Sequence, residues 1–361
     1  MNDRERFVRT VLGEPVDRPS IWINWGPWES TWKRWEAEGK PPEIKDHRSW
    51  MNPDMVPLPV PCNTGPCPRI PRTVLEEDDE YVTFIDTWGI KRRDVKGAES
   101  MSAFLEFPVK DRRDWEEFSE KYLNPDDERR LEPGWRETVF GWMDKGYPIQ
   151  LGYYPDGGIF GGYRWLMGDE AGLIAFHTMP DLVHDIMERL TDIYLTTWER
   201  ALREVRADSV HMWEDMCYRG GPLISPKKWV EFLGPCYRRI QAFTKQHDIH
   251  IISVDTDGDP DKIIPPMMDC GVNLLFPLEV AANCDVNVMR AKYPTLAFMG
   301  GIDKRVLALG PKAIDKELDR VWPAVEKGRY IPDLDHLVPD DVSWENYNYY
   351  VHELKRRVGK P

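Results

Sequence analysis

Cysteine is scarce in this chain, and long apolar runs are missing altogether. Six cysteines among 361 residues are too few for the disulfide framework of a small secreted protein, and no two of them form a C-x-x-C pair. No stretch approaches the roughly 18 consecutive apolar residues of a transmembrane helix. The opening segment MNDRERFVRTVLGEP is charged and amphipathic, unlike a signal peptide. We therefore expect a cytoplasmic protein with reduced thiols and no membrane partner.

Positive charge is also in deficit. Lys and Arg total 48 against 62 Asp and Glu, so the formal net charge is -14. A chain this acidic is a poor candidate for binding the phosphate backbone of a nucleic acid. The sequence also lacks a G-x-G-x-x-G turn and a G-x-S-x-G elbow, which argues against a dinucleotide-binding fold and against a serine hydrolase of that type.

The second part of the chain alternates between strand and helix patterns. Hydrophobic residues make up 41% and charged residues 30%, which is a globular composition. Short apolar runs separated by amphipathic helices, with connections of roughly 2–6 residues, predict a parallel sheet covered by helices. An open doubly wound sheet fits as well, but the missing dinucleotide turn favours a closed α/β barrel of the (β/α)8 TIM type. The predicted strands are 148–154, 208–213, 249–254, 272–276, 295–299 and 329–331.

The N-terminal part is expected to extend this barrel. Residues 4–12 place apolar side chains on one helical face, residues 19–24 resemble a first short strand, and the segment 52–75 is rich in proline. Residues 81–94 have the pattern of a hairpin around Gly89. We expect one barrel domain over residues 1–361, in which 1–75 form a helical and Pro-rich extension.

Acidic residues follow most of the late strands. In a barrel the active site lies at the C-terminal ends of the strands, so these carboxylates should converge. Like charges repel unless a cation, an arginine or shared protons compensate. Two hypotheses follow: a divalent metal such as zinc held by carboxylates and a neutral imidazole, or a proton-transfer site without a metal. The candidate residues are Glu214, Asp255, Asp257, Asp335 and His336.

Several segments together resemble the uroporphyrinogen decarboxylase superfamily, over nearly the whole chain. This resemblance implies a (β/α)8 barrel and one of two activities. These are cofactor-free decarboxylation of a tetrapyrrole, and methyl transfer between a small methylated compound and a corrinoid, assisted by zinc. The segments are RERFVRTVLGEPVDRP at 4–19, DSVHMWED at 208–215, PLISPKKW at 222–229, DG at 257–258, GGID at 300–303 and PDDVSWEN at 339–346.

The chain departs from both patterns of the superfamily. The Arg-Gln-Ala-Gly-Arg signature that follows the first strand of the decarboxylases is replaced by NWGPWES at 24–30, so the arginines that would pair with tetrapyrrole carboxylates are missing. In the methyltransferases the metal is bound by His-x-Cys-Gly and a later Cys. Matching Gly258 and Pro339 puts Asp255 at the His position, Asp257 at the first Cys position and His336 at the last Cys position.

The resemblance is therefore closer to the corrinoid-dependent methyltransferase branch. It implies a metal-dependent transfer of a methyl group from a small O- or N-methylated compound to a corrinoid on a partner protein. Asp257, His336 and Glu214 are then the predicted metal ligands, with the metal acting as a Lewis acid. Glu214, Asp255 and Asp335 are the predicted catalytic or supporting carboxylates.

The pocket wall is predicted from aromatic and polar residues at strand ends, which also suit a methylated ammonium group. The predicted substrate-binding residues are Asn24, Trp25, Trp28, Tyr153 and Tyr154. The alternative activity is a cofactor-free decarboxylase or lyase acting on a small acid, with Asp257 or Glu214 as proton donor. A barrel that binds a cofactor or partner without turnover is a third hypothesis. A homodimer is a further expectation.

Overall fold

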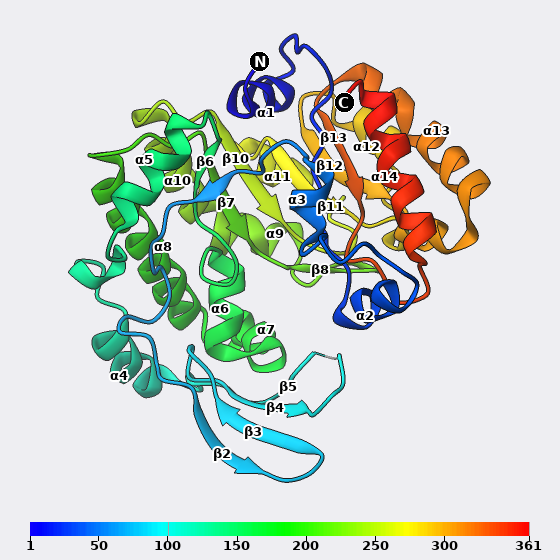
Figure 1. Ribbon diagram of the computed structural model, residues 1–361. Helices are drawn as coiled ribbons and strands as arrows, with labels where there is room; N and C mark the ends of the chain where they lie inside the picture. Colours follow the sequence, from blue (N-terminus) through cyan, green and yellow to red (C-terminus); the bar gives the residue numbers. More distant parts are fainter. Residues whose placement is uncertain (100, 361) are drawn as a thin grey trace.

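A curled parallel sheet of seven strands forms the centre of the protein, surrounded by helices (Figure 1). The computed structural model describes residues 1–99 and 101–360. Every neighbouring pair in this sheet is parallel, which confirms the barrel-type α/β architecture. In spatial order the strands are β1 (Leu58–Pro59), β6 (Ile149–Leu151), β7 (Ser209–Trp213), β10 (Ile251–Asp255), β11 (Leu274–Leu278), β12 (Ala297–Ile302) and β13 (Tyr330–Leu334).

The eighth position of the barrel is filled differently from the prediction. Residues 19–24 are extended but form no strand ladder. They are held by single contacts instead: the Ile21 carbonyl accepts a hydrogen bond from Asp54 N–H at 2.9 Å, and Pro27 forms an isolated parallel bridge with Val338. The segment thus lies between β13 and β1 without completing the sheet. The prediction that residues 19–24 form a first strand is therefore wrong.

Alternation along each strand separates the barrel interior from its helical coat. Ile251, Leu274, Met299 and Ile331 belong to one buried cluster inside the barrel, together with Phe7 and other residues of α1 and its neighbours. The intervening residues belong to the larger cluster under the helices. Because α1 packs against β10, β12 and β13, it covers the N-terminal end of the barrel, and the polar residues are left at the opposite end.

Helices alternate with the strands in the second part of the chain, as the sequence pattern predicts, whereas α2, α3 and α4 in the first part were not predicted. A π-helical turn, η2 (Trp229–Leu233), connects α9 and α10 into one long helix, and three 3-10 turns are η1 (Glu128–Arg130), η3 (Val280–Ala282) and η4 (Lys304–Leu309). The α-helices are α1 (Asp3–Leu12), α2 (Glu29–Ala37), α3 (His47–Met51), α4 (Arg112–Tyr122), α5 (Trp135–Asp144), α6 (Ile159–Met167), α7 (Asp169–Thr178), α8 (Pro180–Leu202), α9 (Pro226–Lys228), α10 (Gly234–Gln246), α11 (Ile264–Asp269), α12 (Val286–Lys292), α13 (Pro311–Lys327) and α14 (Trp344–Val358).

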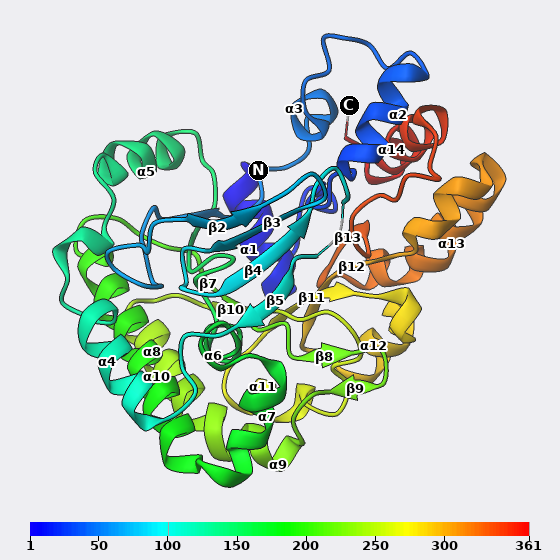
Figure 2. The same cartoon turned by 90° about the horizontal axis from the view of Figure 1, so that it is seen from below.

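A second, antiparallel sheet is larger than the predicted hairpin. It has four strands in sequence order and projects from the barrel beyond α6 and α7 (Figure 1). Seen from below, it passes in front of the ends of β7, β10 and β11 (Figure 2). Its strands are β2 (Thr73–Glu77), β3 (Tyr81–Ile85), β4 (Lys91–Val95) and β5 (Ala103–Glu106), and a small two-stranded ribbon is formed by β8 (Cys217–Tyr218) and β9 (Gly221–Pro222).

Among the described residues, no helix has both the length and the apolar character needed to cross a membrane.

The start of α6 depends on a close approach to β7 that only glycine permits. A Cβ atom at Gly158 would lie 1.7 Å from the Trp213 carbonyl oxygen, which is backbone and cannot move aside. We expect Gly158→Ala to destabilise the fold by at least about 3 kcal/mol, in the range of overpacked cores. Gly141 in α5 has open space around it, so Gly141→Ala is the matched control. It should be neutral or stabilise the protein by up to about 1 kcal/mol. Urea unfolding of both variants measures the difference, and equal stabilities would contradict this account.

Candidate active site

Glu214, directly after β7, is fully buried and bound to backbone. Its two carboxylate oxygens accept hydrogen bonds from the N–H groups of Ile159, Phe160 and Gly161 at 3.2, 2.6 and 3.2 Å, and from the Tyr237 hydroxyl at 2.6 Å. Burial raises its pKa to about 7 although these donors favour the charged form. The carboxylate therefore fixes the first turn of α6, and its role as a metal ligand or acid stays a prediction.

Asp335 has a similar structural role after β13. One oxygen accepts the N–H of Val280 and the other the N–H of Lys304, both at 3.1 Å. It thereby ties the start of η3 and the start of η4 to the end of β13. Burial raises its pKa. Both oxygens accept a backbone hydrogen bond, so Asp335 positions these two turns, and its acid–base role stays a prediction.

Asp333 is a third buried carboxyl with backbone partners. It accepts the N–H groups of Asn24 and Leu334, both at 2.8 Å, and burial raises its pKa to about 8. Asn24 was predicted to bind substrate. Its backbone N–H instead joins the unpaired segment 19–24 to β13, and its carbonyl oxygen accepts a hydrogen bond from Arg48 at 3.2 Å.

Asp257 and His336 meet at the mouth of the barrel, as the sequence predicted. The distance from His336 Nε2 to Asp257 Oδ2 is 3.7 Å, with side chains 25% and 40% exposed. Burial, together with the charges of Glu279 and Asp215, raises the pKa of Asp257 to about 7, against the opposing charge of Lys304. Burial lowers the pKa of His336. Near neutral pH a large fraction of the Asp257 carboxyl is thus protonated, and the imidazole of His336 beside it is uncharged.

The loop that carries Asp257 is held from three sides. Gly258 has φ +77°, and a Cβ there would lie 2.6 Å from the backbone of Tyr218, so a side chain is excluded. The Gly258 N–H donates to Glu279 Oε2 at 2.8 Å, and its carbonyl accepts the Cys284 thiol at 3.5 Å. This close packing positions the neighbouring carboxyl of Asp257.

Asp255 ends β10 on the interior side of the barrel. Its Cα partner in the neighbouring strand is Trp213, and its own carbonyl accepts the N–H groups of Glu214 and Asp215. No described residue donates a hydrogen bond to its carboxyl group. Burial, and then the charge of Asp257, raises its pKa well above the usual range. Asp255 and Asp257 are therefore proton-bearing carboxyls whose oxygens face the site without protein donors.

Aromatic rings surround these groups. Trp25 stacks on His336 with ring centroids 4.7 Å apart and an interplanar angle of 17°, which confirms that these two predicted residues lie together. On the other side, Tyr154 meets Trp213 edge to face at 4.9 Å. Tyr153 and Tyr154 are largely exposed, so they stand at the rim of the site.

Trp28 lies apart from this centre. It lines a groove of about 610 Å³ between the start of α2 and the turn after β4, with Glu29, Ser30, Lys33, Gly97, Ala98, Glu99, Pro339 and Asp340. The predicted wall of the pocket is therefore divided: Trp25 and Tyr154 border the carboxyls, whereas Trp28 borders the second sheet.

The predicted three-ligand metal site does not fit this geometry. Asp257 and His336 are close enough to share a cation, but the oxygens of Glu214 are taken up by the α6 backbone and Tyr237. Within residues 1–99 and 101–360, no three His, Cys, Asp or Glu side chains are arranged to hold a metal ion.

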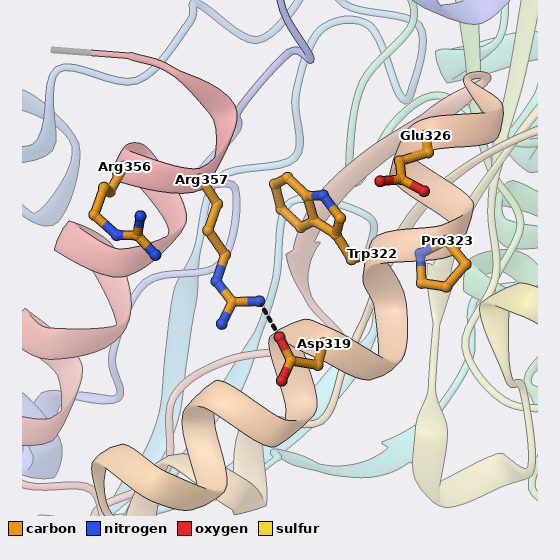
Figure 3. Close-up of a pocket in the computed structure, with 6 residues that line it drawn as sticks. All are labelled: Asp319, Trp322, Pro323, Glu326, Arg356 and Arg357. Carbon is orange, nitrogen blue, oxygen red and sulfur yellow. Dashed lines mark hydrogen bonds and ion pairs between the residues drawn. The ribbon is translucent and has the colours of Figure 1, made fainter.

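A second groove, of about 620 Å³, lies between α13 and α14 on the outer surface (Figure 3). Its Arg357 binds Asp319 at 2.7 Å and Glu353 at 2.8 Å, and Arg356 binds Glu353 at 2.6 Å. Trp322 forms another part of its wall. Both arginines are already paired with carboxylates, so neither is a free cation in this groove.

Two residues of the site were not predicted from the sequence. Trp213 directly precedes the acidic residues that were predicted as site residues. Strand alternation from His211 places it inside the barrel, and this was the available signal. Lys304 acts electrostatically on Asp257, Asp335 and His336, and its positive charge lowers the pKa of all three groups. Its position just after Asp303 at the end of a barrel strand was the available signal.

Known proteins match this chain by family profile and by solved structure, but not by curated sequence. The sequence profile of uroporphyrinogen decarboxylase (URO-D) matches residues 167–357, more than half of the chain. A solved methyltransferase from Methanosarcina mazei has the same fold with a TM-score of 0.63, at 16% sequence identity over 99% of each chain. No curated protein sequence matches the chain.

Stability should fall with rising pH because of Asp333. Its folded-state pKa of about 8 exceeds the value of roughly 4 expected in the unfolded chain. The folded state therefore holds a proton that the unfolded state releases. This contribution is full below about pH 4 and is lost as the pH rises through about 8, at up to about 1.4 kcal/mol per pH unit.

Asp333→Asn keeps an oxygen for the Asn24 N–H but cannot ionise. We expect its unfolding free energy, measured by urea titration from pH 5 to 9, to fall less steeply than that of the wild type. Asp248→Asn, at an exposed position, is the control and should follow the wild-type slope. Parallel slopes for Asp333→Asn and wild type would contradict the assignment.

Proposed function

The chain belongs to the uroporphyrinogen decarboxylase family, and we propose that it is a methyltransferase of this family. The donor would be a small O- or N-methylated compound, and the acceptor a corrinoid carried by a separate protein. The observation that carries this proposal is the pair formed by Asp257 and His336, with a carboxyl that still holds a proton near neutral pH. The methyltransferase name of the Methanosarcina mazei structure that shares this fold points in the same direction.

Methyl transfer from an O-methylated donor requires a proton at the departing oxygen, whereas an N-methylated amine already carries a proton near neutral pH. As the bond from the methyl carbon to oxygen breaks, its electron pair stays on the oxygen, which is a poor leaving group unless it is protonated. A reduced corrinoid would supply the electron pair for the new bond to carbon. An O-methylated donor would then leave as a neutral alcohol or phenol, with its proton supplied by the protein.

Asp257 is the residue placed to supply that proton. Its side chain is accessible at the mouth of the barrel, and burial and neighbouring negative charges keep it protonated to about pH 7. Asp255, two residues earlier and also proton-bearing, can return the proton to Asp257. His336 is uncharged and held flat against Trp25, so it borders the acid without ionising it.

Asp257→Asn tests this assignment. Asparagine keeps the shape of the side chain but cannot donate an acidic proton, so we expect methyl transfer to fall by about 10²-fold or more. The assay follows methylation of free cob(I)alamin with methanol, methylamines and methoxy-substituted aromatic compounds as donors. Asp248→Asn, far more exposed, should keep full activity. Full activity of Asp257→Asn, or no transfer from any donor to the wild type, would refute the proposal.

The pH profile gives an independent test. Only the protonated form of Asp257 can act as the acid, and its pKa is about 7. The rate should therefore be maximal below about pH 6 and decline tenfold per pH unit above about pH 7. A rate that rises through this range would show that the ionised carboxylate is the active form.

Chelation tests the role of a metal. Because the described residues supply only two ligands at the site, we expect transfer activity to survive prolonged dialysis against EDTA. Loss of activity that one equivalent of zinc restores would show that Asp257 and His336 recruit a metal, as the family resemblance implies.

Decarboxylation of a small acid is the second candidate. It uses the same proton-bearing carboxyls, because the carbanion left after loss of carbon dioxide must be protonated. Carbon dioxide release from the donor panel and from small aromatic acids distinguishes the two activities, since methyl transfer releases none.

A further inference from the structure

The four-stranded sheet β2–β5 is fastened on two sides of the barrel mouth. On one side, Phe104 of β5 packs against Trp165 of α6 with ring centroids 5.6 Å apart. On the other, Glu99 in the turn after β4 accepts the Ser30 N–H at 2.6 Å and also the Ser30 hydroxyl. Figure 2 shows the sheet in front of the ends of the central barrel strands. The sheet therefore spans the opening as a lid.

The cross-strand register identifies the face of this lid that is turned to the barrel. Arg92 of β4 pairs with Phe84 of β3 and with Phe104 of β5, so the three side chains share one face. The Arg92 guanidinium lies 4.5 Å from the Phe104 ring and 5.8 Å from the Trp165 ring. The next residue, Arg93, points to the other face, where its Nε donates to Thr83 at 3.0 Å.

The guanidinium of Arg92 is only partly used by the protein. Its Nη1 donates to Asp86 at 3.2 Å, and that carboxylate also accepts the N–H groups of Trp88 and Ile90. The Nε of Arg92 is buried and has no acceptor among the described residues, while the side chain as a whole is 22% exposed. One edge of a permanent cation is thus left without a partner, a costly arrangement in a buried place.

An aromatic floor connects this cation with the reactive carboxyls. Trp165 stacks on Trp213 at 5.3 Å and 17°, and Trp213 is the strand neighbour of Asp255. Tyr154 packs against Trp213 and feels the positive charge of Arg92. On the way from the lid to Asp257, the site therefore presents first the cation of Arg92, then a flat apolar surface, and then a proton donor.

We propose that Arg92 is a specificity-determining residue that binds an anionic group, a carboxylate in particular, at the end of the substrate remote from the transferred methyl. The part of the guanidinium that remains exposed can pair with a carboxylate oxygen, although the Nε itself is enclosed by protein. A flat substrate body would lie along Trp213 and Tyr154, and its methyl-bearing end would reach Asp257. That last placement rests on the proposed function, whereas recognition of the anion by Arg92 does not.

The lid also accounts for how an acidic protein can admit an anion. The mouth of the barrel contains Asp215 and Glu279, whose negative charges would repel a carboxylate. Arg92 places a compensating charge on the other side of the aromatic floor, away from those carboxylates. The substrate class that fits is a small methylated compound with a planar body and a carboxylate at the far end.

Binding of 4-methoxybenzoate and of its neutral isostere 4-methoxybenzamide tests this inference, by isothermal titration at pH 7 without corrinoid. We expect the wild type to bind the acid at least tenfold more tightly than the amide. Arg92→Gln should weaken binding of the acid tenfold or more and change binding of the amide less than twofold. Arg93→Gln, on the same strand but on the opposite face and 44% exposed, should leave both affinities unchanged.

Arg92→Lys separates charge from geometry and provides a second, milder variant. It keeps the cation but loses the planar fork, so its affinity for the acid should fall between those of the wild type and Arg92→Gln. Amide binding reports in every variant whether the site is intact.

Three results would overturn the inference: no saturable binding of 4-methoxybenzoate to the wild type, equal affinities for acid and amide, or equal losses in Arg92→Gln and Arg93→Gln. Loss of both affinities in Arg92→Gln would likewise assign Arg92 a purely structural role. Arg92-dependent binding of the acid without any methyl transfer would overturn the proposed function alone.

Discussion

Buried carboxylates that bind backbone N–H groups hold the loops at the barrel mouth in place. Glu214 binds the first turn of α6, Asp335 the starts of η3 and η4, and Glu279 the loop at Gly258. An anionic acceptor in a poorly solvated place forms stronger hydrogen bonds than a neutral one, although its burial is costly. Each of these residues follows one barrel strand and fixes a loop that follows another, so the geometry of the whole mouth depends on them.

This arrangement divides the acidic residues into two groups with different consequences for chemistry. Glu214 and Asp335 are held in place by two or more backbone hydrogen bonds. Asp255 and Asp257 lack such donors, and burial together with neighbouring negative charges raises the pKa of both carboxyls. The site therefore holds protons instead of charges, which suits a reaction whose leaving group must be protonated.

The lid contributes a positive charge in addition to that of Lys304 at the barrel mouth. Arg92 reaches the site from β4 and is separated from the acidic centre by Trp165 and Trp213. In this arrangement the two ends of a substrate meet different chemistry, a cation at one end and a proton donor at the other. The same separation prevents Arg92 from pairing with Asp255 or Asp257, which would remove their protons.

The sequence by itself determined the barrel and the neighbourhood of its reactive residues. Periodicity and short connections are local properties, and parallel strands bring their C-terminal ends together, so Asp257 and His336 could be placed side by side although they are 79 positions apart. The extended segment 19–24 was mistaken for a strand because local pattern does not reveal whether a neighbour supplies a hydrogen-bond ladder. Of the four-stranded sheet, the sequence predicted only one hairpin, because β2 and β5 are exposed strands without a strong apolar alternation.

Only the tertiary structure decided which carboxylates are free to react. Glu214 and Asp257 are both acidic residues that follow a barrel strand. The hydrogen-bond donors around the Glu214 carboxylate come from α6 and α10, whereas no described residue donates to the Asp257 carboxyl. Whether Arg92 faces the site or the solvent was likewise open, because its neighbour Arg93 carries the same charge. The register of β4 with β3 and β5 settles that orientation, and register is a property of the folded sheet.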